Sequence, residues 1–374
     1  MTYLDYSATT PVNEEVLDSF ITVSKKYIGN PNSLHKLGVE AKNIIDAATE
    51  QIANLLNINT KEIIYTSGAS ESNNTAIKGV ALKYQNRGKH IITTNFEHSS
   101  IYGPLSFLQK QGFKVDFVKT NDKGLVDLDD LKHLITDETI LVSIGYINSE
   151  IGIKQPIEEI GELLNDYPKC FFHVDMTQAL GKIDINLKNI DLASFSAHKI
   201  YGIKGIGLLY KKENISLEPL INGGKSTTVF RSGTPATALI VSFSKAIRLI
   251  LKDLDEKTLH IKELNNYLIK SFENYDDVFI NSNEFCIPNI VNISVLNIKP
   301  ETLQHSLEEY DIYISTQTAC STGNISKSVM ALTNDEKRAL SSVRISLSHL
   351  TTKEEIDYFI NCFDKCYNNL KIKR

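Results

Sequence analysis

Cysteine is scarce in this sequence, and its five occurrences are odd in number and widely spaced. They are Cys170, Cys286, Cys320, Cys362 and Cys366. A set of this kind is typical of a reducing compartment, argues against a disulfide framework and matches no structural zinc spacing. Cys362 and Cys366 lie four residues apart on a predicted helix, so we expect them to share a face and to pack.

Long apolar runs are missing as well. No stretch approaches the roughly 20 residues needed to cross a bilayer. The N-terminal residues include Asp5 and lack the apolar core of a signal peptide. We therefore expect a cytoplasmic protein with no membrane partner. The net charge of −5 gives no general attraction to nucleic acid, so no direct nucleic-acid binding is expected.

The first two thirds of the chain alternate strand and helix patterns, without repeats or low-complexity linkers. Strands are predicted at 62–65, 90–94, 114–118, 139–146, 170–174, 192–196 and 207–210. Helices are predicted at 44–56, 70–85, 101–111 and 157–165. This alternation predicts an α/β fold with a mostly parallel seven-stranded sheet that is covered on both faces.

Beyond about residue 252 the pattern changes to a smaller α+β unit. Helices are predicted at 261–274 and 353–371, and strands at 292–295, 313–315 and 343–346, with a long loop from Cys320 to residue 342. The predicted division is a large domain of residues 12–252 and a small C-terminal domain of residues 253–374. Residues 1–11 are expected to join the small domain.

Ligands of open α/β sheets bind beyond the carboxyl ends of the strands, where two loops of the N-terminal half are polar. Residues 66–72 are small and precede a helix, so their N–H groups and the helix dipole could bind an anion. A plain helix cap at Ser70 is the alternative. His98 follows the strand at 90–94 and could stack on a planar cofactor or act as an acid or base, unless it is an ordinary solvent-facing residue.

Two further loops add an acid and a lysine. Asp175 ends an apolar strand, where a carboxylate needs a partner such as a protonated pyridine nitrogen. A metal site with His173 is the weaker alternative, because no other ligand lies at suitable spacing. Lys199 follows the next strand among small polar residues and could form a Schiff base, although most lysines are surface residues. Ser196 and His198 are near enough in sequence to help bind a phosphate.

Together these loops provide an anion cradle, a stacking ring, an acid for a pyridinium and a lysine for an aldehyde. That combination predicts pyridoxal 5′-phosphate (PLP) as the cofactor. Each residue taken alone is still compatible with an ordinary structural role. Cys320 lies among small polar residues, which favours an accessible nucleophile over a packing residue. Arg344 lies in a predicted strand and could bind a substrate carboxylate bidentately, unless it forms a surface ion pair.

The order of these segments resembles the NifS/IscS-type cysteine desulfurases of the class V aminotransferase group. The resemblance covers almost the whole chain. The segments that carry it are 3–11, 29–31, 66–72, 97–98, 173–178, 196–202, 231–234, 319–320 and 343–346. It implies the PLP-dependent transferase fold type I and a homodimer.

The resemblance also implies residue roles. Lys199 would carry the cofactor and move protons, His98 would stack on the ring and assist acid–base steps, and Cys320 would accept sulfur. The remaining cofactor contacts implied are Ala69, Ser70, Asn148, Ser149, Asp175, Gln178, Ser196, His198 and, reaching a neighbouring subunit, Thr234. Arg344 would take the substrate carboxylate.

The implied reaction converts L-cysteine to L-alanine and leaves a persulfide on Cys320. The sulfur would pass to an acceptor protein for iron–sulfur cluster assembly or tRNA thiolation, and the sequence does not select the acceptor. Three places depart from the family pattern. Ser149 replaces a usual asparagine, Ser70 replaces a usual threonine but keeps the hydroxyl, and the segment 225–229 lacks the usual Gln/His-Glu-Arg.

Two alternatives stay open at this point. One is a PLP lyase or transaminase of the same fold that acts on selenocysteine or another amino acid, in which Cys320 would be dispensable. The other is a non-catalytic PLP-binding scaffold of a sulfur-transfer complex, which only the altered segment 225–229 supports.

Overall fold

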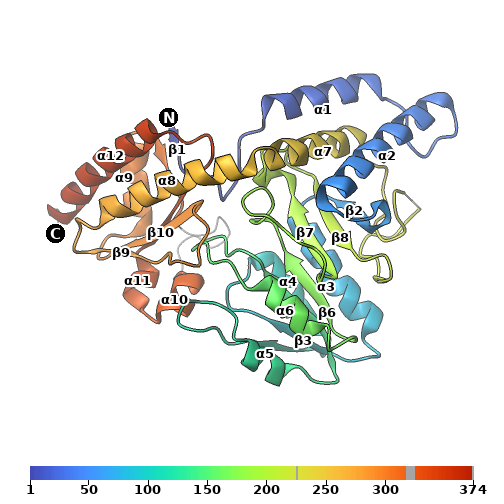
Figure 1. Ribbon diagram of the computed structural model, residues 1–374, viewed down its shortest axis with the longest axis horizontal. Helices are drawn as coiled ribbons and strands as arrows, with labels where there is room; N and C mark the ends of the chain where they lie inside the picture. The colour runs from blue at the N-terminus through green and yellow to red at the C-terminus, as the bar shows by residue number, and fades with distance from the viewer. Residues whose placement is uncertain (225, 317–324, 373–374) are drawn as a thin grey trace.

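The computed structural model describes residues 1–224, 226–316 and 325–372, and a seven-stranded sheet forms its centre (Figure 1). The strand order is β2-β8-β7-β6-β5-β3-β4. The strands are β2 (Ile63–Thr66), β3 (His90–Thr93), β4 (Lys114–Phe117), β5 (Thr139–Gly145), β6 (Phe171–Asp175), β7 (Leu192–Ser196) and β8 (Gly207–Lys211). Strand β8 runs opposite to the other six strands, which confirms the predicted mostly parallel sheet.

Helices cover both faces of this sheet, and alternate strand residues face the two layers. Ile63 and Tyr65 pack in one core with α1, α2, α5, α6 and α7, whereas Ile64 packs in another with α3 and α4. The period of two follows from the pleat of a strand. The helices are α1 (Glu14–Lys26), α2 (Lys36–Leu56), α3 (Ala69–Tyr84), α4 (Ser99–Gln109), α5 (Leu128–Leu134), α6 (Ile157–Leu164) and α7 (Thr237–Leu251).

A second unit has its own core and two small sheets. The strands β9 (Val278–Ile280), β10 (Ile290–Val295) and β12 (Ser342–Ser346) are antiparallel, in the order β12-β10-β9. The helices α8 (Leu254–Phe272), α9 (Pro300–Glu308) and α12 (Lys353–Ile372) pack against them.

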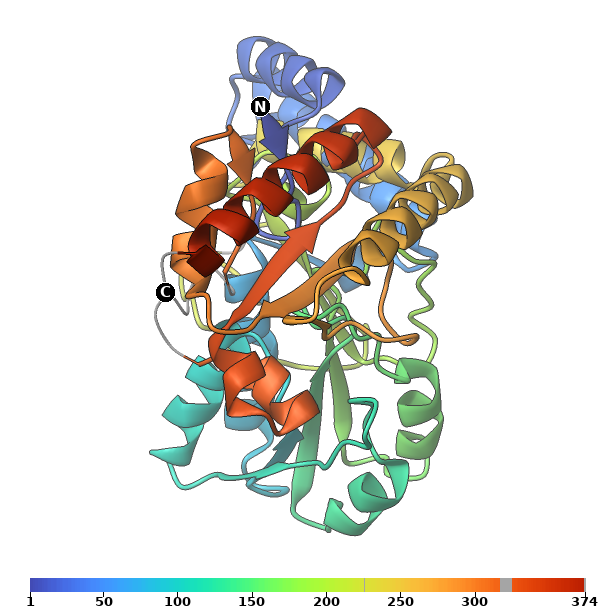
Figure 2. The same ribbon diagram turned by 90° about the vertical axis from the view of Figure 1, so that its left-hand side faces the viewer.

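The first residues of the chain lie in this second unit. Strand β1 (Thr2–Tyr3) pairs in parallel with β11 (Ile312–Tyr313), and Leu4 is buried in the core of the unit. Figure 2 shows the blue N-terminal strand beside α12. The division into residues 12–252 and the remainder stays a prediction.

The stretch after Cys320 is not one continuous loop, and that expectation was wrong. Two short helices, α10 (Lys327–Thr333) and α11 (Glu336–Leu340), precede β12. Side chains cap both, because Ser326 accepts from the Val329 N–H at 3.0 Å and Asp335 accepts from the first turn of α11. In the described ranges, no helix has the length and apolar character that a membrane span requires.

Candidate active site

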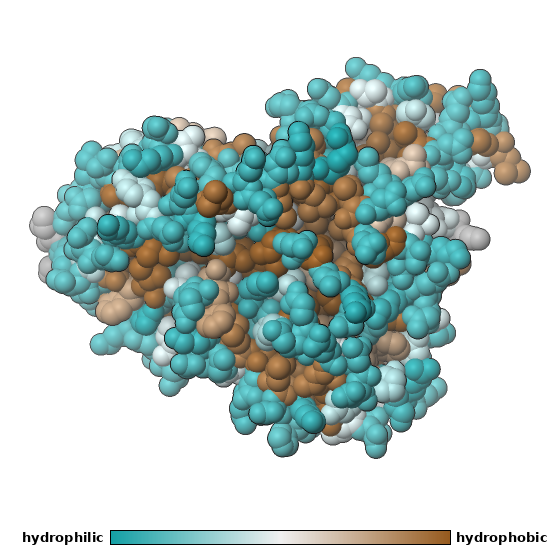
Figure 3. All heavy atoms as spheres, in the orientation of Figure 1, coloured by the Kyte–Doolittle hydropathy of each residue, from teal (hydrophilic) through white to brown (hydrophobic). Residues whose placement is uncertain are grey.

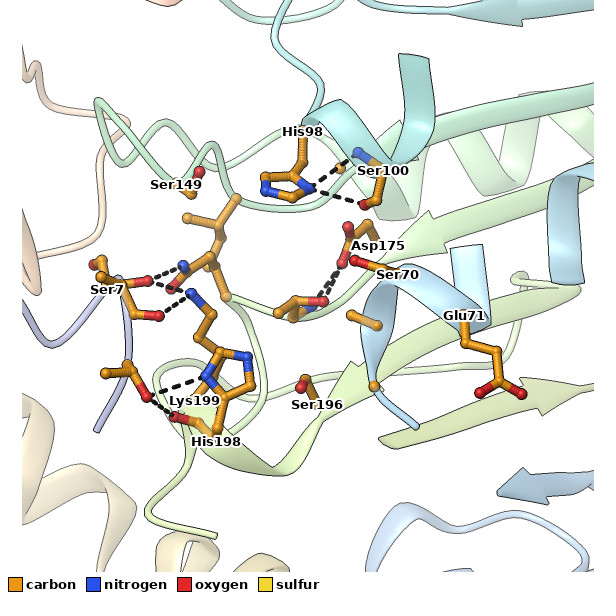
Figure 4. A pocket seen from close by; sticks show the side chains of 18 of the residues that line it. Ser7, Ser70, Glu71, His98, Ser100, Ser149, Asp175, Ser196, His198 and Lys199 are labelled. Atoms are coloured by element: carbon orange, nitrogen blue, oxygen red, sulfur yellow. Dashed lines mark hydrogen bonds between the residues drawn. The ribbon is translucent and has the colours of Figure 1, made fainter. Parts of the chain in front are cut away.

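A cavity of about 560 Å³ opens where the carboxyl ends of the central strands face the second unit. Most of the predicted site residues line it: Ala69, Ser70, His98, Ser149, Asp175, Gln178, Ser196, His198, Lys199 and Arg344. Asn148 and Thr234 are not among the lining residues. Cys320 lies outside the described residues. Figure 4 shows the labelled side chains converging on the cavity from several elements.

Lys199 is held at the edge of the cavity by the N-terminal segment. It ends the short 3₁₀ helix η2 (Ala197–Lys199), which follows β7 directly. Its ammonium group donates to the carbonyl oxygens of Ser7 and, at 2.7 Å, of Ala8 (Figure 4). Ser7, which lies 192 positions before Lys199 in the sequence, therefore helps to fix the direction of the lysine side chain.

Asp175 lies at the end of β6, and three hydrogen bonds orient its carboxylate. One oxygen accepts from the Thr177 N–H at 2.9 Å and from the Thr177 hydroxyl. The other accepts from Asn73 Nδ2 at 2.8 Å. A carboxylate offers about four acceptor sites, so Asp175 keeps capacity for a cationic N–H in the cavity.

His173 lies behind Asp175 on the same strand and is fully buried. Its two ring nitrogens contact Ser143 Oγ at 2.9 Å and Ser194 Oγ at 3.0 Å. Burial lowers the pKa of His173 to about 4, with Asp175 opposing the shift, so the ring is neutral. These contacts make His173 a structural residue. Within the described ranges, no three His, Cys, Asp or Glu side chains could hold a metal ion.

His98 precedes α4 and uses its ring as the helix cap. His98 Nδ1 accepts from the Ser100 N–H at 3.2 Å and lies 2.8 Å from the Ser100 hydroxyl. Burial lowers the pKa of His98, with the charge of Lys199 acting in the same direction and Asp175 opposing. The preceding Glu97 is buried, and desolvation raises its pKa to about 8.

The start of α3 has an uncapped N-terminus of the kind that an anion cradle requires. Its N-cap, Gly68, has φ +151°, and no side chain caps the helix, so N–H groups of the first turn face the cavity mouth. The backbones are close here, because a Cβ on Gly207 would lie 2.6 Å from Gly68 Cα. Ser196 and His198 line the same cavity, and burial and the charge of Lys199 lower the pKa of His198 to about 4.

Glu71 ties this first turn to the segment that precedes α7. Its carboxylate accepts from the Ser67 N–H at 2.7 Å and from Arg231 Nε at 2.9 Å. Burial by itself raises the pKa of Glu71, but the hydrogen bonds from Arg231 and Ser67 outweigh it, and the pKa is lowered. The Glu71 carboxylate therefore links the start of α3 to Arg231.

Gln178 is buried at the inner end of the cavity, and both ends of its amide are engaged. Its Nε2 donates to the Ser7 carbonyl at 2.9 Å, and its Oε1 accepts from Lys182 Nζ at 2.8 Å. Burial, together with the charges of Lys199 and Arg344, lowers the pKa of Lys182 to about 7. Because Lys182 donates to Oε1, the other end of the Gln178 amide must be the NH₂ donor.

Arg344 on β12 is only 2% exposed and has two protein anchors. Its Nη1 donates to the Ser149 carbonyl at 2.8 Å and its Nη2 to Asp5 at 2.7 Å. Asn148 turns its amide away, because Nδ2 donates to Phe96 O and Oδ1 accepts from the Ile151 N–H at 2.7 Å. Ser149, not Asn148, is therefore the residue of this pair that faces the cavity.

Sequence reasoning missed several residues that organise the site. Asn73, Ser100 and Thr177 hold Asp175 and His98 by hydrogen bonds, and the carbonyls of Ser7 and Ala8 accept from Lys199. Asn73 lies three positions after Ser70 on α3, and that spacing puts both side chains on one helix face. The carbonyls of residues 7 and 8 leave no comparable signal in a sequence.

Comparisons of the sequence and of the structure with known proteins all identify the same family. The family model "Aminotransferase class-V" matches residues 2–359. A "NifS/IcsS protein homolog" of Lactobacillus delbrueckii subsp. bulgaricus is 42% identical over 99% of this chain and 98% of its own. A "Cysteine desulfurase IscS" of Dictyoglomus turgidum is 38% identical over 99% and 95%. A solved "NifS-like protein" superposes with a TM-score of 0.93 at 35% identity, covering 99% of both chains.

Proposed function

The chain belongs to the class V aminotransferase family and within it to the NifS/IscS-type cysteine desulfurases, and we propose that it moves sulfur from L-cysteine to Cys320. It is a PLP-dependent enzyme of that family. The observation that carries the proposal is one cavity in which Lys199, Asp175 and His98 meet Arg344. The first three suit the cofactor, and the arginine suits an amino-acid substrate.

The described residues fit PLP at every group that the cofactor presents. The uncapped start of α3, with Ser196 and His198, suits a phosphate, and Asp175 suits a pyridinium nitrogen. Gln178 Nε2 is a donor suited to the phenolic oxygen. When bound, PLP supplies an electron sink for charge that develops on the substrate Cα.

The chain's own groups would then divide the work. Arg344 N–H groups bind the substrate carboxylate and orient it. Lys199 Nζ would hold the cofactor and, when it is a free amine, would move the proton of the substrate Cα. Both groups are anchored from the N-terminal segment, since residues 5, 7 and 8 accept their hydrogen bonds. This segment places the substrate carboxylate relative to the proton-transfer group.

The sulfur step balances without an external oxidant. The Cys320 thiolate attacks the substrate sulfur, the bond between that sulfur and Cβ breaks, and Cβ receives a proton, which leaves L-alanine and a Cys320 persulfide. A thiol reductant or an acceptor protein then removes the outer sulfur. The acceptor is an iron–sulfur scaffold, a tRNA-thiolating enzyme or a sulfur carrier. A cytoplasmic location suits this thiol chemistry, and the four described cysteines are unpaired.

A homodimer is part of the proposal. Thr234 is exposed and stands apart from the cavity of its own chain, which agrees with a role toward a neighbouring subunit. Apolar side chains are also exposed at the outer end of the α1–α2 pair, where Ile28 is 75% and Leu34 97% exposed. Apolar atoms gather there in Figure 3. Exposed apolar patches of this kind mark interaction surfaces.

The decisive experiment compares the wild type with Cys320→Ala in the presence of L-cysteine and a thiol reductant. Alanine and sulfide are measured together. We expect equal amounts of both from the wild type and almost none from the variant. Release by both proteins would instead indicate the lyase, and silence from a PLP-loaded wild type would indicate a required partner or the scaffold. Neither of these alternatives is favoured by the names of the relatives.

A further inference from the structure

The cap of α4 determines which nitrogen of His98 carries a proton. The Ser100 backbone N–H points at His98 Nδ1 at 3.2 Å. A backbone N–H can only donate, so Nδ1 must present a lone pair to accept it. In a neutral imidazole the single proton is then on Nε2. In Figure 4 the second ring nitrogen of His98 lies on the side of the ring away from Ser100.

The Ser100 hydroxyl is oriented toward the same nitrogen by Asn73. Asn73 Nδ2 donates to Ser100 Oγ at 2.8 Å and to Asp175 Oδ2 at 2.8 Å. The hydroxyl therefore accepts from Asn73, and its own hydrogen is directed to His98 Nδ1, 2.8 Å away. Three residues from α3, α4 and β6 form one chain of hydrogen bonds that ends on the imidazole.

The orientation of the Asn73 amide is itself determined. The opposite orientation would place the amide oxygen against the Asp175 carboxylate, acceptor against acceptor. In the orientation present, Asn73 Oδ1 is buried and finds no hydrogen-bond partner among the described residues. An unsatisfied buried acceptor is costly. In this orientation both amide hydrogens are donated, one to Asp175 and the other to Ser100.

We propose that Ser100 and Asn73 are positioning residues that hold His98 in the tautomer with its proton on Nε2. His98 then presents a hydrogen-bond donor to the cavity, and the removal of protons is left to Lys199. The charged groups near the ring are Asp175 and Lys199, beside a buried Glu97 whose raised pKa keeps it largely protonated near pH 7, and the net effect of burial and the two charges lowers the pKa of the ring and favours its neutral form. The mechanistic consequence rests on the proposed function, whereas the tautomer itself does not.

The test is nuclear magnetic resonance of the protein with ¹⁵N-labelled histidine, recorded with and without PLP. His98→Asn identifies the His98 signals among those of the nine histidines. Ser100→Ala removes the hydroxyl and keeps the backbone cap. Ser100→Thr keeps a hydroxyl and should restore the wild-type spectrum. Ser99→Ala, at the exposed neighbouring position, is the matched control.

In the wild type we expect an unprotonated Nδ1 and a protonated Nε2 near neutral pH. In Ser100→Ala the Nε2–H to Nδ1–H ratio should fall about two- to tenfold, as expected for the loss of one hydrogen bond. A wild-type proton on Nδ1 would overturn the proposal. An unchanged ratio in Ser100→Ala would overturn the role of its hydroxyl. Alanine release is measured separately, so a failure of the desulfurase assignment would leave this result intact and recognisable.

Discussion

Replacing Arg344 by lysine tests the substrate side of the site. The guanidinium has five N–H donors in a fixed fork. One nitrogen is anchored on Ser149 O and another on Asp5, and Arg344 Nε is buried without a partner among the described residues. These two hydrogen bonds fix the orientation of the guanidinium group and therefore also the direction of its remaining N–H donors. A lysine keeps the positive charge but cannot bond Ser149, Asp5 and a substrate carboxylate in the same arrangement.

The magnitude follows from the hydrogen bonds that are lost. A hydrogen bond to a charged group contributes about 1.5–3 kcal/mol, which corresponds to a decrease of about 10- to 150-fold in kcat/KM. The substrate carboxylate does not change during the reaction, so the loss of its hydrogen bonds weakens the binding of the substrate and of the transition state alike. We therefore expect the KM for L-cysteine to rise while kcat changes little. Arg344→Ala is unsuitable, because it leaves Asp5 uncompensated and costs about 3–5 kcal/mol of stability.

The assay is steady-state alanine release against L-cysteine concentration, with the visible absorbance of bound PLP as a check on cofactor occupancy. Arg338→Lys is the matched control. Arg338 on α11 is also anchored, on Asn281 Oδ1 at 2.7 Å and on Ile280 O at 2.9 Å, but it does not line the cavity. A lower kcat with an unchanged KM in Arg344→Lys would refute the reasoning, as would equal losses in both variants.

Three further predictions concern residues around the cofactor site. Lys182→Met should be more stable than the wild type near pH 7, and the difference should shrink toward pH 10; thermal denaturation across pH checks this, and parallel curves would contradict it. The reason is that the folded-state pKa of Lys182 is lowered to about 7, so between that value and about 10.4 the unfolded chain binds more protons and stability rises with pH. Ser149→Ala should weaken PLP binding about two- to tenfold through one lost hydrogen bond, measured by titration of the apoenzyme with PLP. Losses of PLP affinity in Glu71→Gln and Arg231→Gln should not add in the double variant.

The central sheet was predictable from the sequence because each strand carries a local signal. The run at 139–146, for example, is apolar and β-branched, and β5 spans Thr139–Gly145. Helix α7 was not predicted, although its buried residues Ile240, Phe243, Ile247 and Ile250 follow the helical period. Helix α1 buries only Val16 and Val23, but Asn13 caps it, acids begin it and lysines end it, and this capping signal could have found it.

The candidate site, like the fold, was predictable from the sequence only in part. The ends of parallel strands meet at one edge of a sheet, so sequence order alone predicted that Asp175, Lys199 and His98 would share a cavity. The partners that orient these side chains come from elsewhere in the chain. Ser7 lies 192 positions from Lys199, and Asn73 lies 102 from Asp175. Such pairs leave no periodicity or spacing, so only the folded chain reveals them.

The residues just before α7 contact the start of α3 through Arg231. This segment lacks residues that the family usually has, yet Arg231 keeps an ion pair with Glu71 at the start of α3. The side chains of Glu71 and Arg231 are 15% and 29% exposed, so solvent screens the pair only in part. If the pair holds the anion cradle in place, either single substitution breaks the same link, and we expect a coupling of about 1 kcal/mol in PLP affinity. Additive losses, measured by PLP titration of the two single variants and the double variant, would show that the segment acts independently of the cradle.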